Sequence, residues 1–112
     1  MRVHHLAFRT RDLATLERFY TDALGLSVTR RDGERSVWLR TGGAILMIER
    51  ADDAEPSIAP GAMDLVAFAI EANDVDRWRR VLAANGIAVE GETAFTLYFR
   101  DPDGRRIGLS HY

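Results

Sequence analysis

Apolar and polar residues alternate along residues 1–50 in segments that predict the order strand, helix, strand, strand, strand. Residues 2–9 carry β-forming side chains and predict a first strand. Asp12 can cap a helix whose apolar residues recur at helical spacing until Gly25. Three strands follow, with the hairpin signal Asp32-Gly33 between the first two. These strands are predicted over residues 26–30, 36–40 and 44–49.

The same order of elements recurs later in the chain. Residues 51–62 hold two of the three prolines and predict an irregular connector. A strand over residues 64–71 precedes a helix that Asn73 or Asp74 can cap and Gly86 can end. Trp78 lies on the apolar stripe of this helix and is expected in the core. Three more strands are predicted over residues 87–90, 95–100 and 105–111.

This recurrence predicts an internal duplication. Leu6-Ala7-Phe8 matches Val66-Ala67-Phe68, Leu39-Arg40 matches Phe99-Arg100, and we align Ile48-Glu49 with Ile107-Gly108. The predicted fold class is α+β, with two βαβββ modules at residues 1–50 and 63–112 in a single domain. The two open sheets are expected to meet edge to edge as a cupped, partly open mixed β-sheet barrel with the helices outside.

Composition and charge narrow the class of protein. A chain of 112 residues suits one domain, and dimerisation would help so small a domain to bury surface. A net charge of −2 argues against a nucleic-acid binder, and the arginines, Arg30 and Arg106 among them, are interleaved with acids and predicted to form solvated faces. No cysteine is present, which excludes thiolate metal sites. No signal segment or long apolar run is visible, so we expect a cytoplasmic protein without a membrane partner.

Several short motifs, taken in order, resemble a known family. They are His5-Leu6-Ala7-Phe8, Asp12-Leu13, Phe19-Tyr20, Leu24-Gly25-Leu26 and the run from Phe99 to Ile107. Their order and spacing resemble the vicinal oxygen chelate superfamily, also called the glyoxalase, bleomycin-resistance and extradiol-dioxygenase group, over nearly the whole chain. The resemblance implies two βαβββ modules in a cupped sheet, usually in a homodimer. It also implies that metal-dependent members bind Fe, Mn, Ni, Zn or Mg through His or Gln on a first strand and Glu on a last strand of each module.

In this chain only two of the four positions where the resemblance implies metal ligands carry a donor side chain. The first-module positions are His5 and Glu49, whereas the second-module positions are Leu65 and Gly108, which offer no donor side chain. One imidazole and one carboxylate would hold a divalent ion weakly, so we expect no cofactor, with a divalent metal on His5 and Glu49 as the alternative. His4 is expected to face away from His5, and a hydrogen bond from His5 to Glu49 is the simpler expectation.

The missing ligands instead predict a ligand pocket with a partly apolar floor. Gly108 in a strand is typical of close approach by a ligand or by another part of the backbone. Strand alternation adds neighbours to His5, Glu49, Leu65 and Gly108 on the same faces. The added pocket residues are Ala7, Met47, Ala67 and Tyr112, with Trp38, Phe95 and Tyr98 as aromatic walls.

Three functions are compatible with these residues. We favour a small-molecule-binding protein with a degenerate metal site and a planar or apolar ligand. The alternative is a metal-dependent lyase, isomerase or dioxygenase with a remodelled site around His5 and Glu49, completed by a dimer partner. A third reading makes Glu49 and His5 the catalytic proton-transfer pair of a metal-free enzyme.

Overall fold

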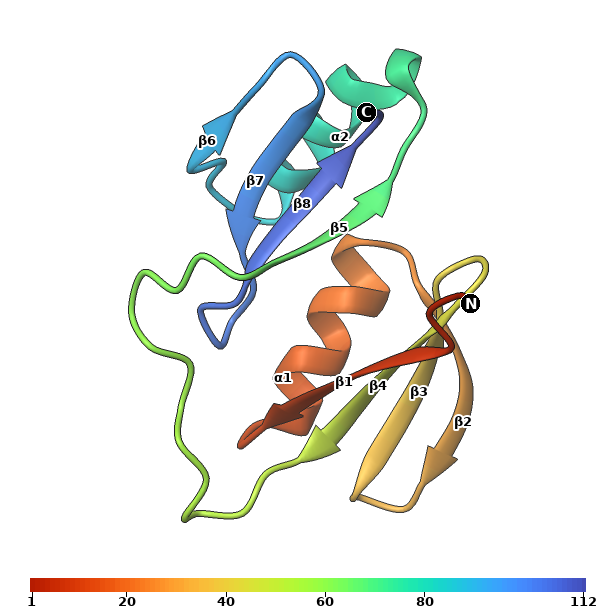
Figure 1. Cartoon of the computed structure of the whole chain (residues 1–112), viewed down its shortest axis with the longest axis vertical. Helices are drawn as coiled ribbons and strands as arrows, with labels where there is room; N and C mark the ends of the chain where they lie inside the picture. Colours follow the sequence, from red (N-terminus) through yellow and green to blue (C-terminus); the bar gives the residue numbers. More distant parts are fainter. The chain divides into compact units, whose positions relative to one another are not determined.

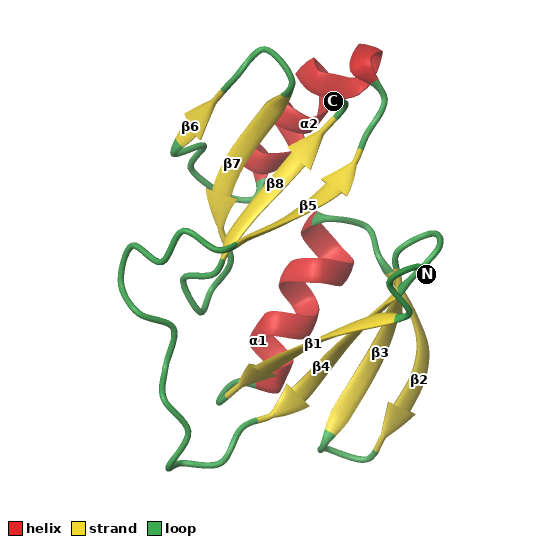
Figure 2. Cartoon of the chain, viewed as in Figure 1, coloured by secondary structure: helices red, strands yellow, loops and turns green.

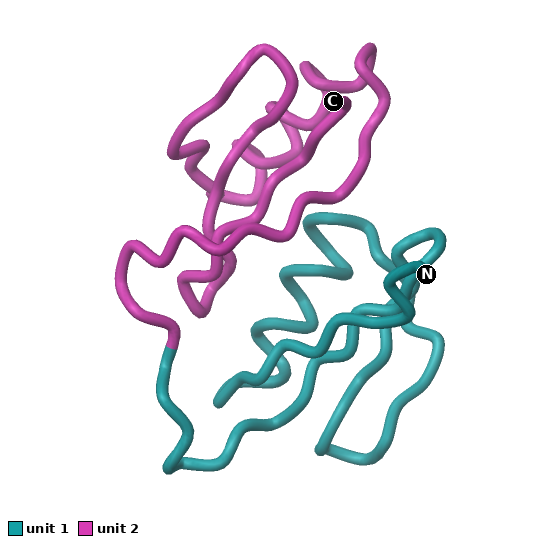
Figure 3. Tube along the Cα trace, in the orientation of Figure 1, with its two compact units in different colours: residues 1–57 teal, residues 58–112 magenta.

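The computed structural model describes all residues, 1–112, and divides them into two compact units. The first unit spans residues 1–57 and the second spans residues 58–112, as Figure 3 shows in two colours. The division falls within the segment 51–62, where the composition predicts the connector.

The first unit is a four-stranded mixed sheet with a helix against one face (Figure 1). The strand order is β1-β4-β3-β2, with β1 parallel to β4 and the other neighbours antiparallel. The elements are β1 (His5–Thr10), α1 (Leu13–Arg18), the π-helical turn η1 (Phe19–Ala23), β2 (Ser27–Asp32), β3 (Ser36–Arg40) and β4 (Ile45–Arg50).

The second unit repeats this topology, with the strand order β5-β8-β7-β6 (Figure 2). Its elements are β5 (Leu65–Ala69), the 3-10 turn η2 (Ala72–Asp74), α2 (Val75–Ala84), β6 (Gly91–Glu92), β7 (Thr96–Arg100) and β8 (Arg106–Ser110). Two open mixed sheets, each with one helix, confirm the predicted α+β class and the βαβββ order of each module. Neither helix has the length and apolarity needed to span a lipid bilayer.

The two modules differ in the length of their helical segments. From Asp12 to Gly25 the first module is one residue longer than the second module from Asp74 to Gly86. The first segment ends in the wide turn η1, whereas the second begins with the 3-10 turn η2. Gly25 and Gly86 both have positive φ values, of 76° and 70°, and allow the chain to leave the helix.

Alternation along the strands buries one face of each sheet. In the first unit Phe8, Leu46 and Ile48 are buried on the helix side, together with Leu16 and Tyr20 of the helical segment. The second unit buries a similar set of side chains, contributed mainly by its strands. They are Leu82, Leu97, Phe99, Ile107 and Leu109. The opposite face of each sheet carries side chains that are mostly exposed or half-buried, and we call this face the open face.

Two sequence predictions in the second unit are wrong. Residues 87–90 form no strand, because Ile87 N–H still bonds to the helix carbonyl of Leu82, and ladder bonding begins only where Glu90 N–H donates to Tyr98. Trp78 is half-buried rather than a core residue. The Arg77 guanidinium lies over the Trp78 ring, 4.9 Å from its centroid.

Candidate functional site

The open face of the first unit brings three predicted pocket residues into one row across the sheet. Ala7 on β1 is opposite Met47 on β4, and Met47 is opposite Trp38 on β3. Arg30 on β2 is paired with Trp38, and its guanidinium lies over the indole ring at 4.8 Å from the centroid. The row therefore runs from a small side chain to a thioether and then to an aromatic ring covered by an arginine.

His5 and Glu49 share this open face but are not close together. His5 is opposite Ile45 in the parallel β1–β4 pair, four positions before Glu49, which corresponds to about 13 Å along a parallel strand. The structure gives no hydrogen bond between them, contrary to the sequence expectation. Glu49 is opposite Arg9, and their charged atoms are 3.9 Å apart.

His5 instead contacts His4, which was expected to face away. The two Nδ1 atoms are 2.9 Å apart and the rings meet edge to face, with centroids 5.2 Å apart. His4 precedes β1, so strand alternation does not direct its side chain. Both histidines are exposed.

At the Glu49 end of this open face, Arg9 of β1 forms an ion pair with Glu55 in the segment after β4. Arg9 donates two hydrogen bonds of 2.9 Å to Glu55, and these bonds are the largest cause of a lowered pKa at the Glu55 carboxyl. A polar hollow of about 430 Å³ lies beside Arg9 and Glu49 and is lined by further charged side chains. Glu49 thus belongs to an ion-paired rim of the sheet.

The open face of the second unit contains the corresponding row. Ala67 on β5 is opposite Gly108 on β8, and Gly108 is opposite Tyr98 on β7. Gly108 is buried, and a Cβ atom added to it would be 3.1 Å from Thr96 Cγ2. The same Cβ would be 3.4 Å from Ala67 Cβ and from Leu65 Cδ1. Three apolar groups therefore close over the glycine, and Leu65 itself stays 41% exposed.

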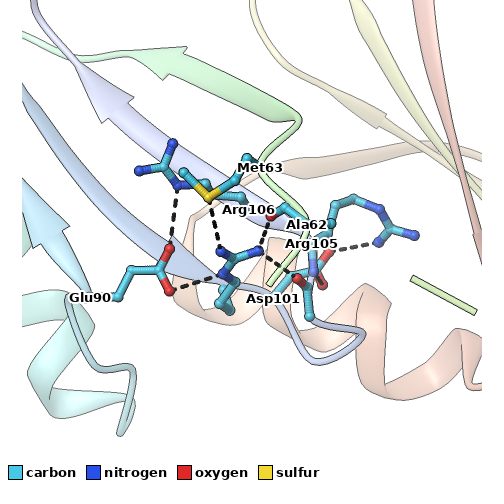
Figure 4. Close-up of polar contacts among 8 residues, drawn as sticks. Ala62, Met63, Glu90, Asp101, Arg105 and Arg106 are labelled. Atoms are coloured by element: carbon cyan, nitrogen blue, oxygen red, sulfur yellow. Dashed lines mark hydrogen bonds and ion pairs between the residues drawn. The ribbon is translucent and has the colours of Figure 1, made fainter. Parts of the chain in front are cut away.

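Arg106 covers the aromatic end of this row. Its guanidinium lies 4.2 Å from the Tyr98 ring centroid, and its Nε is 3.4 Å from Glu90 Oε1 (Figure 4). The other carboxylate oxygen of Glu90 accepts a 2.9 Å bond from Arg100. The bond from Arg100, with a smaller contribution from Arg106, holds the pKa of Glu90 below its ordinary value.

The neighbouring polar groups stabilise the turn between β7 and β8. Arg100 donates to the carbonyls of Ala62 and Gly104, which anchors the entrance of β5 to the turn (Figure 4). Asp101 is only 4% exposed and accepts a 2.7 Å bond from Arg105. The Asp-Pro-Asp-Gly turn at residues 101–104 is therefore a structural element.

Comparison of the two rows corrects the alignment of the duplicated halves. Met47 faces Ala7 and Trp38 as Gly108 faces Ala67 and Tyr98. The offset in residue number between β4 and β8 is thus 61. The sequence alignment of Glu49 with Gly108 had used an offset of 59. Met47 is the counterpart of Gly108, and Glu49 is the counterpart of Ser110.

Tyr112 does not join the open face of its unit. It follows β8, is 98% exposed, and meets Phe95 edge to face at 5.1 Å, while His111 meets the same ring at 5.6 Å. Phe95 precedes β7 and contributes to a separate polar hollow of about 330 Å³ beside the start of α2. The predicted pocket residues in this unit that do share the open face are Leu65, Ala67, Tyr98 and Gly108.

Sequence reasoning gave no site role to the two arginines that cover aromatic rings on the open faces. Arg30 and Arg106 were expected in solvated faces because they are interleaved with acids. Alternation with Gly108 does place Arg106 on the open face, and this was the available signal for it. Arg30 had no comparable signal, because a register shift in β2 between Val28 and Arg30 decides which side chain faces Trp38.

Comparisons with known proteins agree with this architecture. The family model described as Glyoxalase/Bleomycin resistance protein/Dioxygenase superfamily matches residues 2–109. Virulence protein STM3117 of Salmonella typhimurium is 30% identical, over 99% of this chain and 84% of its own length. Metallothiol transferase FosB of Staphylococcus epidermidis is 26% identical, over 96% of this chain and 79% of its own length.

The solved structures give the same result for the fold. Fosfomycin resistance protein FosX of Listeria monocytogenes has a TM-score of 0.85 at 19% identity, over 99% of this chain and 90% of that one. A mutant of that FosX has been solved with manganese(II). The family match and the 30% identical relative together identify the family. The chain belongs to the Glyoxalase/Bleomycin resistance protein/Dioxygenase superfamily.

Proposed function

We propose that this chain is a small-molecule-binding member of the superfamily whose metal site is degenerate. The proposal depends on the side chains at the four positions where the family resemblance implies metal ligands. The strand register replaces Glu49 by Met47 as the counterpart of Gly108 among these positions. These positions hold His5 and Met47 in the first unit and Leu65 and Gly108 in the second. One imidazole is left, beside a thioether, an isobutyl group and a bare backbone.

This donor set does not fit the divalent ions that the family resemblance implies. Such ions prefer carboxylate, imidazole and water oxygen ligands, and a catalytic site keeps about three ligands from the protein. A Met thioether prefers soft ions, and Leu and Gly side chains donate nothing. The chain also has no cluster of three or more His, Cys, Asp or Glu side chains arranged to hold an ion. We therefore derive no chemical step through a metal.

The same positions support a pocket for a planar or apolar ligand. Each open face has a small residue, a central position without a charged group, and an aromatic ring in one row. Flat molecules bind well to such surfaces because ring stacking adds to the burial of apolar area. We propose His5, Ala7, Trp38 and Met47 as contacts in one module. In the other module we propose Leu65, Ala67, Tyr98 and Gly108.

A second candidate is a metal-dependent lyase, isomerase or dioxygenase built around His5 and Glu49. Two similar proteins favour it, since one is a metallothiol transferase and a mutant of another was solved with manganese(II). In this reading a homodimer partner supplies the missing ligands. We propose a cytoplasmic homodimer for either function, because a domain of this size gains from burying more surface.

The two candidates differ in metal content and in what His5 does. The test is elemental analysis of protein expressed with Mn, Fe, Ni and Zn in the medium, together with melting curves with and without EDTA. We expect less than stoichiometric metal, no change of melting temperature with EDTA, and saturable binding of the neutral probe N-phenyl-1-naphthylamine. The matched controls are His5→Ala and His111→Ala. One tightly held metal per chain that is lost in His5→Ala and kept in His111→Ala would overturn the proposal.

A further inference from the structure

We infer that the open faces select a planar ligand that carries an anionic group, held by an arginine stacked on an aromatic ring. This inference rests on the proposed binding function and names the chemistry of its ligand. Its first support is that the arrangement occurs twice. Arg30 covers Trp38 at 4.8 Å and Arg106 covers Tyr98 at 4.2 Å, although the two arginines come from different strands of their modules.

The aromatic residues of the two stacks occupy equivalent register positions. Trp38 is opposite Met47 and Tyr98 is opposite Gly108, the pair related by the duplication. Arg30 reaches its ring from β2, whereas Arg106 reaches its ring from β8. The internal duplication therefore does not explain why Arg106 stacks on Tyr98, because the equivalent stack in the first module uses an arginine from a different strand.

Arg106 is held in an orientation that leaves hydrogen-bond donors available. Tyr98 covers one face of its guanidinium, and Glu90 accepts only from the Nε atom, at 3.4 Å. In Figure 4 the two terminal nitrogens of Arg106 point away from Glu90. The side chain is 19% exposed, so its planar fork is partly fixed before a ligand arrives. Such a fork binds carboxylate, sulfonate or phosphate groups through two parallel hydrogen bonds.

The two open faces differ in the balance of their charged groups. Their strands hold five arginines and two acids, and Glu55 and Glu90 reach in from loops. The arginines are Arg9, Arg30, Arg40, Arg100 and Arg106, and the strand acids are Asp32 and Glu49. In the first unit three arginines are balanced by three acids, whereas in the second unit Arg100 and Arg106 are opposed by Glu90 alone, although the whole chain carries −2. Complementarity of charge therefore favours an anion over a cation at the open face of the second unit.

The shape of the second row explains why the ligand is flat. The groups packed over Gly108 are the Thr96 and Ala67 methyl groups and the end of Leu65, and they form a low apolar surface beside the Tyr98–Arg106 stack. Leu65 borders this low surface and is 41% exposed. A flat ring on this apolar surface would place an attached acidic group beside the terminal nitrogens of Arg106. Planar aromatic carboxylates and sulfonates have this combination of features.

A matched pair of fluorescent probes tests the inference. 1-Anilinonaphthalene-8-sulfonate and N-phenyl-1-naphthylamine share the same ring system, and only the first carries an anionic group. We expect the sulfonate to bind about tenfold more tightly, which corresponds to about 1.4 kcal/mol, because only the sulfonate can accept charge-assisted hydrogen bonds from Arg106. Arg106→Gln should remove most of this advantage and leave the affinity for the neutral probe within about twofold.

Arg80→Gln is the charge-matched control, because Arg80 lies exposed on α2 and not on an open face. Arg30→Gln measures the contribution of the first module in the same way. Equal affinities for the two probes, or equal effects of Arg106→Gln and Arg80→Gln, would overturn the inference and leave the proposed binding function intact. Failure of both probes to bind folded protein would overturn the binding function itself. Circular dichroism of each variant confirms that folded protein is compared.

Discussion

Gly108 offers the sharpest test of the open face, because its bare backbone is already covered by neighbouring side chains. The substitution Gly108→Ala places a methyl carbon 3.1 Å from Thr96 Cγ2 and 3.4 Å from both Ala67 Cβ and Leu65 Cδ1. Ordinary contacts between carbon atoms are about 3.5–4.0 Å. Thr96 cannot rotate away freely, because its hydroxyl is hydrogen-bonded to the Ser110 hydroxyl at 2.8 Å.

Two opposing effects set the size of the change. Inserting a methyl group into packed surroundings costs about 1–3 kcal/mol. Replacing Gly by Ala in an ordinary strand conformation recovers about 0.4–1 kcal/mol by restricting the unfolded chain, and Gly108 has no positive φ. We therefore expect Gly108→Ala to lower the free energy of unfolding by about 1 kcal/mol, which is roughly 4 °C in melting temperature for a domain of this size.

Urea titration followed by circular dichroism measures this change. Gly91→Ala is the matched control, since Gly91 is also a strand glycine without positive φ, and a Cβ there has nothing within 4 Å. That control should be neutral or slightly stabilising. Thr96→Ser deletes the crowding methyl and keeps the hydroxyl, so in its background the loss from Gly108→Ala should largely disappear. Equal effects of the two glycine substitutions, or a loss that persists with Thr96→Ser, would refute the packing argument.

The remaining predictions concern a helix cap and two carboxylates. Asp12→Ala should lower the free energy of unfolding by about 1 kcal/mol, because the Asp12 carboxylate accepts a capping hydrogen bond from Thr15 N–H at the start of α1. Asp74→Ala should lower it less, because the Asp74 side chain makes no capping bond to α2. Equal losses in urea titrations would contradict this. The pKa of Glu90 is lower in the folded chain than its value of about 4.3 in the unfolded chain. The Glu90 carboxylate therefore stabilises the fold fully above about pH 4.3, and this stabilisation is lost as the pH falls through the folded-state pKa. The stability difference between the wild type and Glu90→Gln should therefore shrink between pH 5 and pH 3, and a constant difference would be inconsistent with the contact. Glu55→Gln should speed proteolytic cleavage after β4, because the segment loses its charge-assisted bonds to Arg9. Unchanged cleavage would argue against this anchoring role.

The sequence alone determined the order and type of most elements, because local signals decide them. Asp12 caps the first helix, glycines end both helices, and alternation identifies the strands and their open faces. The duplication of the βαβββ unit follows from the recurrence of these signals. The strand expected over residues 87–90 failed because helix-capping bonds occupy the start of that segment.

Only the tertiary structure decided which residues are opposite one another. The alignment of Glu49 with Gly108 was two residues out of register, and a slip of two positions leaves every side chain on the same face. The alternation of side chains therefore does not reveal a slip of two positions, whereas the hydrogen-bonded ladders show that Met47 and Gly108 are equivalent. The arginine stacks also depend on pairing between strands, which local sequence patterns do not specify. Composition and local patterning thus determined the modules, and long-range strand pairing determined the chemistry of their open faces.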